Sequence, residues 1–173
     1  MEKLEKKNGM EKLMLETLME QQREYFASGA TLPVKVRMEA LSRLEKALQK
    51  QEQILCKALH TDLGKSKTES VMCEIGLVQG EIRWMKQHLG RLCRTKHVRT
   101  PLAQFAAKSY QSPSPYGNVL IMSPWNYPVL LTLEPLVDAI AAGNTAVVKP
   151  SAYAPASANA LKDLLEECFP PEY

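Results

Sequence analysis

The chain has 173 residues, of which 45% are hydrophobic and 24% charged, and its formal net charge is +3. This balance is typical of a soluble globular protein, and nucleic-acid binding would require a larger one-sided excess of basic residues. No apolar run approaches the ~18–20 residues of a membrane span, and the charged N-terminus is unlike a secretory signal, so we expect a cytoplasmic protein.

The first half of the chain is expected to be helical, because apolar residues recur there at helical spacing. The predicted helices cover residues 10–26, 34–60 and 68–90. Ser66 and Glu69 fit a capping box at the start of the third helix. We assign residues 1–20 to an extra amphipathic helix and residues 21–100 to a helical segment. Such apolar stripes are more typical of a core or a helix–helix seam than of a functional site.

Glycines and prolines set the expected boundaries of several elements. Gly29, Gly64 and Gly90 are expected to end the three helices. Pro135 lies inside a later helical pattern, where it should kink the helix or mark its true start. Pro155 fits the first turn of the last helix.

The pattern changes near Thr100-Pro101, where strands begin to alternate with helices. A loop rich in Pro, Ser and Gly precedes a strand over 118–123, a helix over about 128–142, a strand over 145–149 and a helix over about 155–168. This β-α-β-α order implies parallel strands with right-handed crossovers. The sequence therefore predicts an α/β fold, in which residues 101–173 begin a doubly wound parallel sheet.

Both predicted strands end in polar residues. Ser123-Pro124-Trp125-Asn126 follows the first strand, and Lys149-Pro150-Ser151 follows the second. Ligands of open α/β sheets bind beyond the carboxyl ends of the strands. If the strands are neighbours, Asn126 and Lys149 border one crevice. An asparagine amide can donate to an oxygen that gains negative charge, so we expect a dinucleotide-dependent enzyme that handles a carbonyl.

Several longer motifs occur in a fixed order along the chain. The later ones are Pro115-x-Gly117, Pro124-Trp125-Asn126-Tyr127-Pro128, Ala139-Ile140-Ala141-Ala142-Gly143-Asn144-Thr145 and Val147-Val148-Lys149-Pro150-Ser151. The earlier ones are Phe26-x-Ser28-Gly29-x-Thr31, Arg37, Ala58-Leu59-x-x-Asp62-Leu63-Gly64-Lys65-Ser66, Glu69 and Glu74-Ile75. From about residue 22 onward the chain resembles the N-terminal portion of the aldehyde dehydrogenase superfamily, in its class 3-like branch.

This resemblance implies roles for individual residues. Asn126 matches the asparagine whose side-chain amide helps form the oxyanion hole when a thiolate attacks an aldehyde. Lys149 matches the lysine that hydrogen-bonds the adenosine ribose of NAD or NADP. Ser123 and Trp125 match positions whose backbone lines the cofactor cleft. Ser151 either belongs to the same cleft or caps the next element.

One position departs from the family pattern in a way that concerns cofactor choice. The family often has an acidic residue three positions after the lysine, where it holds the ribose 2′-hydroxyl, but this chain has Ala152 there. A carboxylate would disfavour a 2′-phosphate. Its absence makes NADP more plausible and leaves the choice between NAD and NADP open.

No cysteine of the chain fits the role of the nucleophile. The 173 residues also contain neither the family's Gly-Ser-Thr turn nor its Glu-Leu-Gly-Gly segment. Cys56 and Cys73 fit core positions. Cys93 lies among Arg and Lys residues, none of which can act as a general base for it. The glutamates before Cys168 should raise its thiol pKa. All four lack CxxC spacing, so we expect free thiols and no metal site.

We therefore expect this chain to be the N-terminal part of an enzyme that oxidises an aldehyde to a carboxylic acid through a cysteine thiohemiacetal. The full-length enzyme is expected to be a homodimer. The isolated chain is predicted to be inactive. Two alternatives stay open: a non-catalytic interaction or oligomerisation module, and a relative that releases the acyl group to coenzyme A. The basic cluster at 91–99 is interpreted as a solvated loop.

Overall fold

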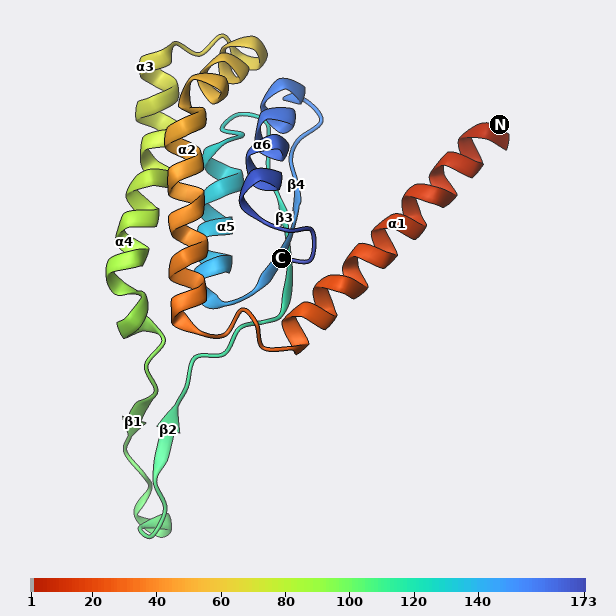
Figure 1. The fold of residues 1–173 in the computed structure, drawn as a ribbon. Helices are drawn as coiled ribbons and strands as arrows, with labels where there is room; N and C mark the ends of the chain where they lie inside the picture. The colour runs from red at the N-terminus through yellow and green to blue at the C-terminus, as the bar shows by residue number, and fades with distance from the viewer. Residues whose placement is uncertain (1) are drawn as a thin grey trace.

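The computed structural model describes residues 2–173, with side chains described from residue 13 onward. The first half contains α1 (Glu2–Ala27), α2 (Val34–Leu63), α3 (Lys67–Ser70), a π-helical turn (Val71–Ile75) and α4 (Gly76–Leu92). The second half contains β1 (Lys96–Val98), a 3₁₀ turn (Leu102–Gln104), β2 (Ser109–Gln111), β3 (Asn118–Met122), α5 (Leu130–Ala142), β4 (Thr145–Lys149) and α6 (Pro155–Cys168). Figure 1 shows these elements along the chain. The α/β fold that the sequence predicts is confirmed.

The predicted helix ends are confirmed in two cases and wrong in one. Gly29 and Gly64 follow the ends of α1 and α2 with φ values of 74° and 68°, a left-handed conformation that glycine adopts without steric cost. Gly90 keeps a helical conformation, and α4 continues to Leu92, because the amide of Cys93 still donates to the carbonyl of Leu89. Unlike Gly29 and Gly64, Gly90 does not have a positive φ.

The third helical stretch contains a feature that periodicity does not predict. Ser66 caps α3 as expected, since its hydroxyl accepts a hydrogen bond from the amide of Glu69 at 3.1 Å. The π-helical turn then inserts an extra residue into the helix. As a result Glu74 and Ile75, which are neighbours in sequence, are both fully buried. A Cβ at Gly76 would lie 2.7 Å from the carbonyl oxygen of Val71, so the turn requires a glycine there.

The strands β3 and β4 pair in parallel, as predicted, with Asn118 opposite Thr145 and Met122 opposite Lys149. The connecting helix α5 begins five residues before Pro135, so this proline does not mark its start. Pro155 occupies the first turn of α6 as predicted. Both α5 and α6 pack against α2, which also contacts α4, so the core lies between the helical segment and the helices that follow the strands (Figure 1).

A hairpin formed by β1 and β2 was not predicted. It pairs Lys96 with Gln111 and Val98 with Ser109 in antiparallel register, and Figure 1 shows that it extends away from the body of the molecule. Part of the basic cluster at 91–99 is therefore a strand rather than a loop, although all three residues of this strand are exposed.

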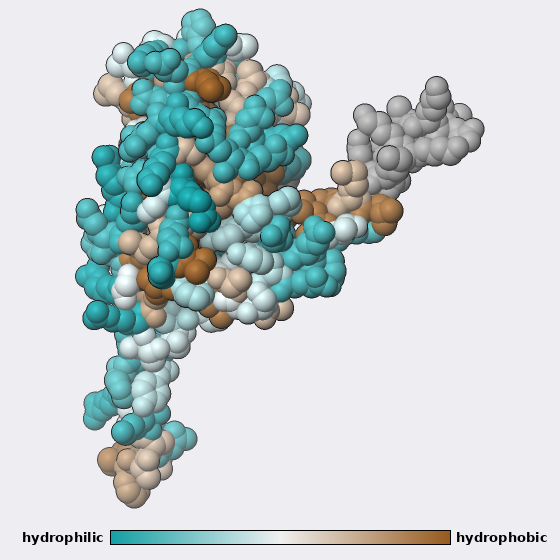
Figure 2. Space-filling model, viewed as in Figure 1, coloured by the Kyte–Doolittle hydropathy of each residue, from teal (hydrophilic) through white to brown (hydrophobic). Residues whose placement is uncertain are grey.

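The helix α1 also projects from the body (Figure 1). Leu13 and Met14, which belong to its apolar stripe, are 64% and 70% exposed, and Figure 2 shows this apolar surface in brown. Met10, another member of the stripe, lies outside the described side chains. Within the part of the chain that the structure describes, none of the helices combines the length and apolar composition of a bilayer span.

Candidate functional site

The two segments that were predicted to form one crevice are neighbours in the structure. Met122 and Lys149 are opposite each other at the carboxyl ends of β3 and β4. One residue further, the amide of Ser123 donates to the carbonyl of Lys149 at 3.2 Å. Both segments leave the sheet at the same edge. Asn126 and Lys149 therefore lie at adjacent strand ends, where open α/β sheets bind their ligands.

The Asn126 and Lys149 side chains are exposed and, in the part of the chain that the structure describes, form no contact that would compete with a ligand. Trp125, Asn126 and Lys149 are exposed, while Ser123 and Ser151 are half-buried. Within the described residues, neither the Asn126 carboxamide nor the Lys149 ammonium takes part in a hydrogen bond or an ion pair. Both groups therefore have their donors available for a bound molecule.

The hydroxyl of Ser123 points to the protein rather than to a ligand. It lies 2.6 Å from the hydroxyl of Thr132, which itself donates to the carbonyl of Pro128 at 2.5 Å. A threonine hydroxyl has one proton, so Ser123 must be the donor in the first bond. Any contact of Ser123 with a cofactor is therefore left to its backbone, as the resemblance implies.

Ser151 supports the turn that leads into α6. Its hydroxyl accepts a hydrogen bond from the amide of Tyr153 at 3.2 Å, and its carbonyl accepts one from the amide of Ala154 at 3.3 Å. This local role is close to the capping alternative considered from the sequence, although Ala154 is the residue that immediately precedes the helix.

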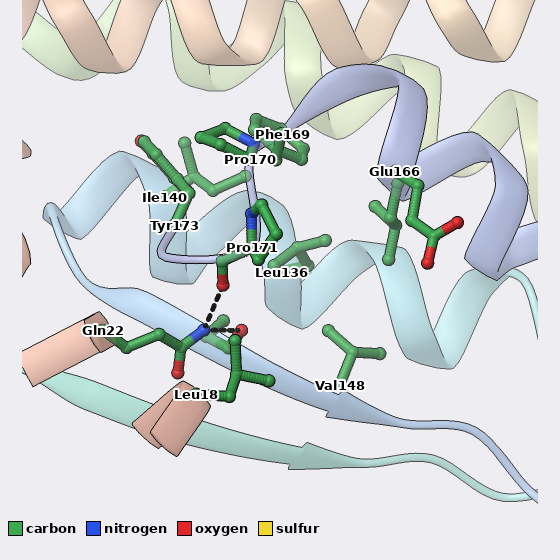
Figure 3. Close-up of a pocket in the computed structure, with 12 residues that line it drawn as sticks. Leu18, Gln22, Leu136, Ile140, Val148, Glu166, Phe169, Pro170, Pro171 and Tyr173 are labelled. Carbon is green, nitrogen blue, oxygen red and sulfur yellow. Dashed lines mark hydrogen bonds between the residues drawn. The ribbon is translucent and has the colours of Figure 1, made fainter. Parts of the chain in front are cut away.

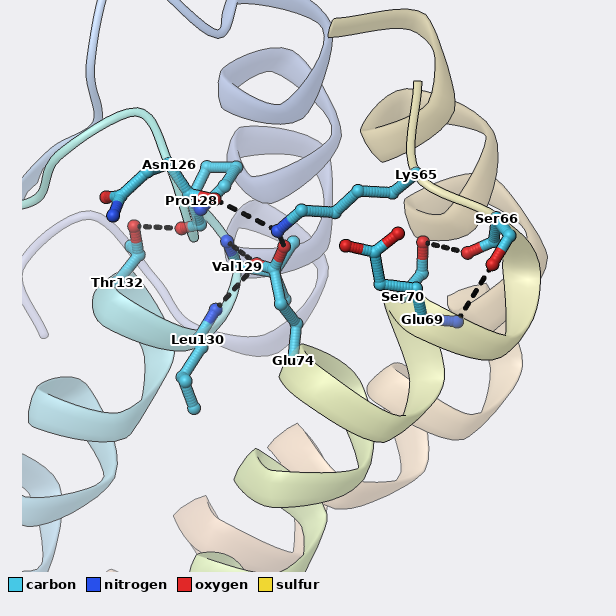
Figure 4. A network of polar contacts seen from close by, with 10 residues as sticks. All are labelled: Lys65, Ser66, Glu69, Ser70, Glu74, Asn126, Pro128, Val129, Leu130 and Thr132. Carbon is cyan, nitrogen blue, oxygen red and sulfur yellow. Dashed lines mark hydrogen bonds and ion pairs between the residues drawn. The ribbon is translucent and has the colours of Figure 1, made fainter. Parts of the chain in front are cut away.

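A buried ion pair behind Asn126 was missed by the sequence analysis. Lys65 and Glu74 are 8% and 0% exposed at their side chains, and the Lys65 Nζ lies 2.5 Å from Glu74 Oε1. The same Nζ donates to the main-chain carbonyl of Asn126 at 2.9 Å. Glu74 Oε2 accepts from the amides of Val129 at 2.8 Å and Leu130 at 3.2 Å (Figure 4).

Carboxylates of the helical segment occupy the N-termini of both helices that follow the strands. Glu74 accepts the first amides of α5, and Asp62 accepts the amides of Ala156 at 3.1 Å and Ser157 at 2.7 Å in α6. A free helix N-terminus attracts phosphate groups, but these two are already neutralised. Neither helix N-terminus therefore offers a free site for a phosphate group.

A cavity of about 360 Å³ lies elsewhere, between α1, α5, β4 and the C-terminal segment (Figure 3). Its lining contains none of the five predicted site residues. At its edge, Gln22 Nε2 donates to the carbonyls of Ala146 at 3.2 Å and Pro171 at 3.5 Å. This contact fastens the end of α1 to the sheet, so we assign the cavity to packing of α1 rather than to the site.

All four cysteines are free thiols, as predicted. Cys56 is buried, but Cys73 is only half-buried, so the expectation of a core position holds for Cys56 alone. Burial, together with the neighbouring Glu167, raises the pKa of the Cys168 thiol to about 11. A raised pKa disfavours the thiolate, which is the nucleophilic form, and this agrees with the exclusion of Cys168 as a nucleophile.

The raised pKa of Cys168 predicts slow alkylation. At pH 8 about one Cys168 thiol in a thousand is ionised, so iodoacetamide should label Cys168 at least ten times more slowly than Cys73 in the folded chain. The labelling rate should rise with pH until about pH 11. Peptide mass spectrometry measures both rates, and labelling in urea provides the control. Preferential alkylation of Cys168 at pH 7 would mean that it is an activated nucleophile.

The comparisons with known proteins agree on one family. Residues 4–173 match the sequence model of the aldehyde dehydrogenase family. This match extends further toward the N-terminus than the motifs quoted above, which begin at about residue 22. The chain is 44% identical over 149 residues to 4,4'-diaponeurosporen-aldehyde dehydrogenase of Staphylococcus aureus, and this match covers 86% of the chain and 32% of the relative. It is 37% identical over 153 residues to aldehyde dehydrogenase family 3 member A2 of Rattus norvegicus, and this match covers 88% of the chain and 32% of the relative.

A solved structure shows the same arrangement of elements. The substrate-bound state of AldH from Staphylococcus aureus superposes with a TM-score of 0.90 at 42% identity, and covers 92% of this chain and 35% of that one. The chain thus spans about a third of the length of the relatives it matches.

Proposed function

The chain belongs to the aldehyde dehydrogenase family, and from this premise we propose that it forms the N-terminal part of an NAD(P)-dependent enzyme that oxidises an aldehyde to a carboxylic acid. One observation carries the proposal. Asn126 and Lys149 follow the adjacent carboxyl ends of β3 and β4, and both side chains are exposed. Such a pair offers an amide donor for the reacting oxygen and an ammonium for the cofactor at one edge of the sheet.

In the proposed reaction, a cysteine thiolate from outside this segment attacks the aldehyde carbon, and the carbonyl oxygen gains negative charge. The Asn126 carboxamide donates a hydrogen bond to this oxygen and so stabilises the tetrahedral adduct. A nicotinamide dinucleotide held near Lys149 would supply the hydride acceptor. Loss of the hydride turns the adduct into a thioester, and water cleaves its carbon–sulfur bond to release the carboxylic acid and restore the thiol.

The residues around Lys149 suit a nicotinamide dinucleotide. The exposed ammonium can donate to the ribose hydroxyls, while the backbone at Ser123 and Trp125 and the turn at Ser151 border the same edge of the sheet. Ala152 is exposed and uncharged, so this position places no carboxylate against a 2′-phosphate. We therefore keep both NAD and NADP in the proposal. We also propose a cytoplasmic homodimer for the whole enzyme.

A second candidate function is an interaction module, which the exposed apolar residues of α1 favour. Leu13, Met14, Leu15 and Met19 are 64%, 70%, 49% and 37% exposed. A surface of this kind on a projecting helix is suited to a partner. Cofactor titration during size-exclusion chromatography separates the two functions. A defined oligomer without affinity for NAD(P) would favour the interaction module.

The deciding experiment compares two proteins in an absorbance assay for NAD(P)H with a panel of aldehydes. The 173-residue chain is expected to show no turnover above a denatured control, because it supplies no nucleophile. The protein translated from the complete gene is expected to oxidise at least one aldehyde. Turnover by the 173 residues alone would refute the predicted inactivity, and its absence from the complete gene product would refute the proposed activity.

A further inference from the structure

We propose that Lys65 and Glu74 are positioning residues that hold Asn126 in the orientation needed for oxyanion binding. This proposal rests on the proposed function of Asn126. The Lys65–Glu74 pair contacts the chain at three points around the turn: the carbonyl of Asn126 and the amides of Val129 and Leu130. No other charged side chain of the described residues bonds to this turn.

The burial of the pair requires an explanation. Removing two charges from water costs several kcal/mol per ion, and a buried ion pair often stabilises a protein no better than apolar residues of the same volume. Here each charge is satisfied by groups of the turn as well as by its partner. Lys65 Nζ also lies 3.9 Å from the ring centroid of Tyr127. The pair therefore favours one conformation of the 126–130 turn over others.

The contacts hold the backbone from which the Asn126 side chain projects. Lys65 holds the main-chain carbonyl of Asn126 toward the protein, and Figure 4 shows that the carboxamide points away from Lys65. A hydrogen bond to the carbonyl fixes the peptide plane between Asn126 and Tyr127. Pro128 has a fixed φ and restricts Tyr127 before it, and Glu74 accepts hydrogen bonds from the two amides beyond it. Rotation of the turn that would carry the carboxamide inward breaks these bonds.

Both members of the pair are themselves held by special backbone geometry. Lys65 follows the left-handed Gly64 that ends α2, and its carbonyl lies 3.1 Å from the Nδ1 of His60. Glu74 lies in the π-helical turn, which directs it inward next to the buried Ile75. The turn that carries Asn126 is thus aligned by the helical segment and not by its own strand alone.

The test uses a double variant, Lys65→Met with Glu74→Met, which removes both charges and the acceptor of the Val129 and Leu130 amides. Both residues are changed because a single change would leave the partner buried and uncompensated. The Lys86–Glu45 pair is the matched control: its atoms are 2.7 Å apart, it is also partly buried, and it joins α4 to α2. Lys86→Met with Glu45→Met makes the same two changes without contact to the 126–130 turn.

The first measurement is NMR relaxation and amide exchange in the 173-residue chain. In the wild type and the control variant, the backbone order parameters of Asn126 and Tyr127 should be about 0.85. In the Lys65/Glu74 variant these order parameters should fall below about 0.6. Exchange of the Val129 and Leu130 amides should accelerate at least tenfold relative to Leu133. Unchanged order parameters in a folded variant would overturn the proposal.

The second measurement is the kinetics of the complete gene product. The Lys65/Glu74 variant should lower kcat at least tenfold and leave the KM for NAD(P) unchanged, and it should cause no further loss in an Asn126→Ala background. Equal losses in both backgrounds would mean that the pair does not act through Asn126. If the wild type oxidised no aldehyde, the proposed function would fail, while the order parameters would still decide whether the pair orients the turn.

Discussion

Replacing Asn126 with alanine in the protein translated from the complete gene is expected to lower kcat for NAD(P)-linked aldehyde oxidation by about 100–1000-fold, or roughly 2.7–4 kcal/mol. The carboxamide is exposed and unpaired within the described residues, so its removal leaves the fold intact. Its donor is proposed to strengthen its hydrogen bond as the carbonyl oxygen becomes negative. The loss should therefore appear in kcat rather than in the KM for the cofactor.

Two further variants sharpen this test. Asn126→Asp keeps the size of the side chain but presents a carboxylate to the oxyanion, so it should lose at least as much activity as the alanine variant. Asn159→Ala changes an exposed asparagine in α6 and should leave kcat unchanged. A melting temperature equal to the wild type's establishes that each variant is folded. An Asn126→Ala enzyme within threefold of the wild type would remove the oxyanion role.

The elements that place Asn126 and Lys149 were predictable because their signals are local. The apolar run before Ser123 and the one before Pro150 have the length of strands, and the pattern between them has the length of a helix. Parallel pairing follows from that order, and the register confirms it. The same locality explains α6, whose first turn is marked by Pro155.

The residues that hold the site in place were not predictable in the same way. Glu74 binds the amide of Val129 across 55 positions, and Lys65 reaches Asn126 across 61. No periodicity encodes such separations. The residue type alone does not tell whether a glutamate or a lysine is buried or exposed. In addition, the π-helical turn that buries Glu74 interrupts the apolar spacing from which a helix is predicted.

The hairpin illustrates a second limit. Its strands have three residues each, and β1 is exposed at every position. A strand with no buried face lacks the alternation of apolar and polar residues, so its residues resemble a charged loop. The strand is distinguished from a loop by its pairing with residues 109–111, which lie more than ten positions further along the chain.

The largest stability effect is expected for Arg37→Met. Arg37 is 7% exposed and donates to the carbonyls of Thr31 at 3.0 Å, Leu32 at 2.6 Å and Ala141 at 3.1 Å, and to the Cys93 sulfur at 3.2 Å. Methionine fills much of the same volume but satisfies none of these acceptors. Each buried acceptor that loses its partner costs about 1–3 kcal/mol, so urea unfolding should show a loss of about 3–5 kcal/mol.

Gly143 provides an independent test of the same contact, because it lies directly against the guanidinium. It has φ +93°, and a Cβ there would lie 2.7 Å from Arg37 Cζ, so Gly143→Ala should displace Arg37 and strain the backbone. The Arg37→Met/Gly143→Ala double variant should then lose less stability than the sum of the losses of the two single variants.

Arg23→Met is the control. Arg23 pairs with Glu20 at the surface, where the two side chains are 60% and 61% exposed. Losing this pair should cost under about 1 kcal/mol of unfolding free energy. Equal losses for Arg37→Met and Arg23→Met would show that the buried guanidinium does not hold α2 to the end of α5.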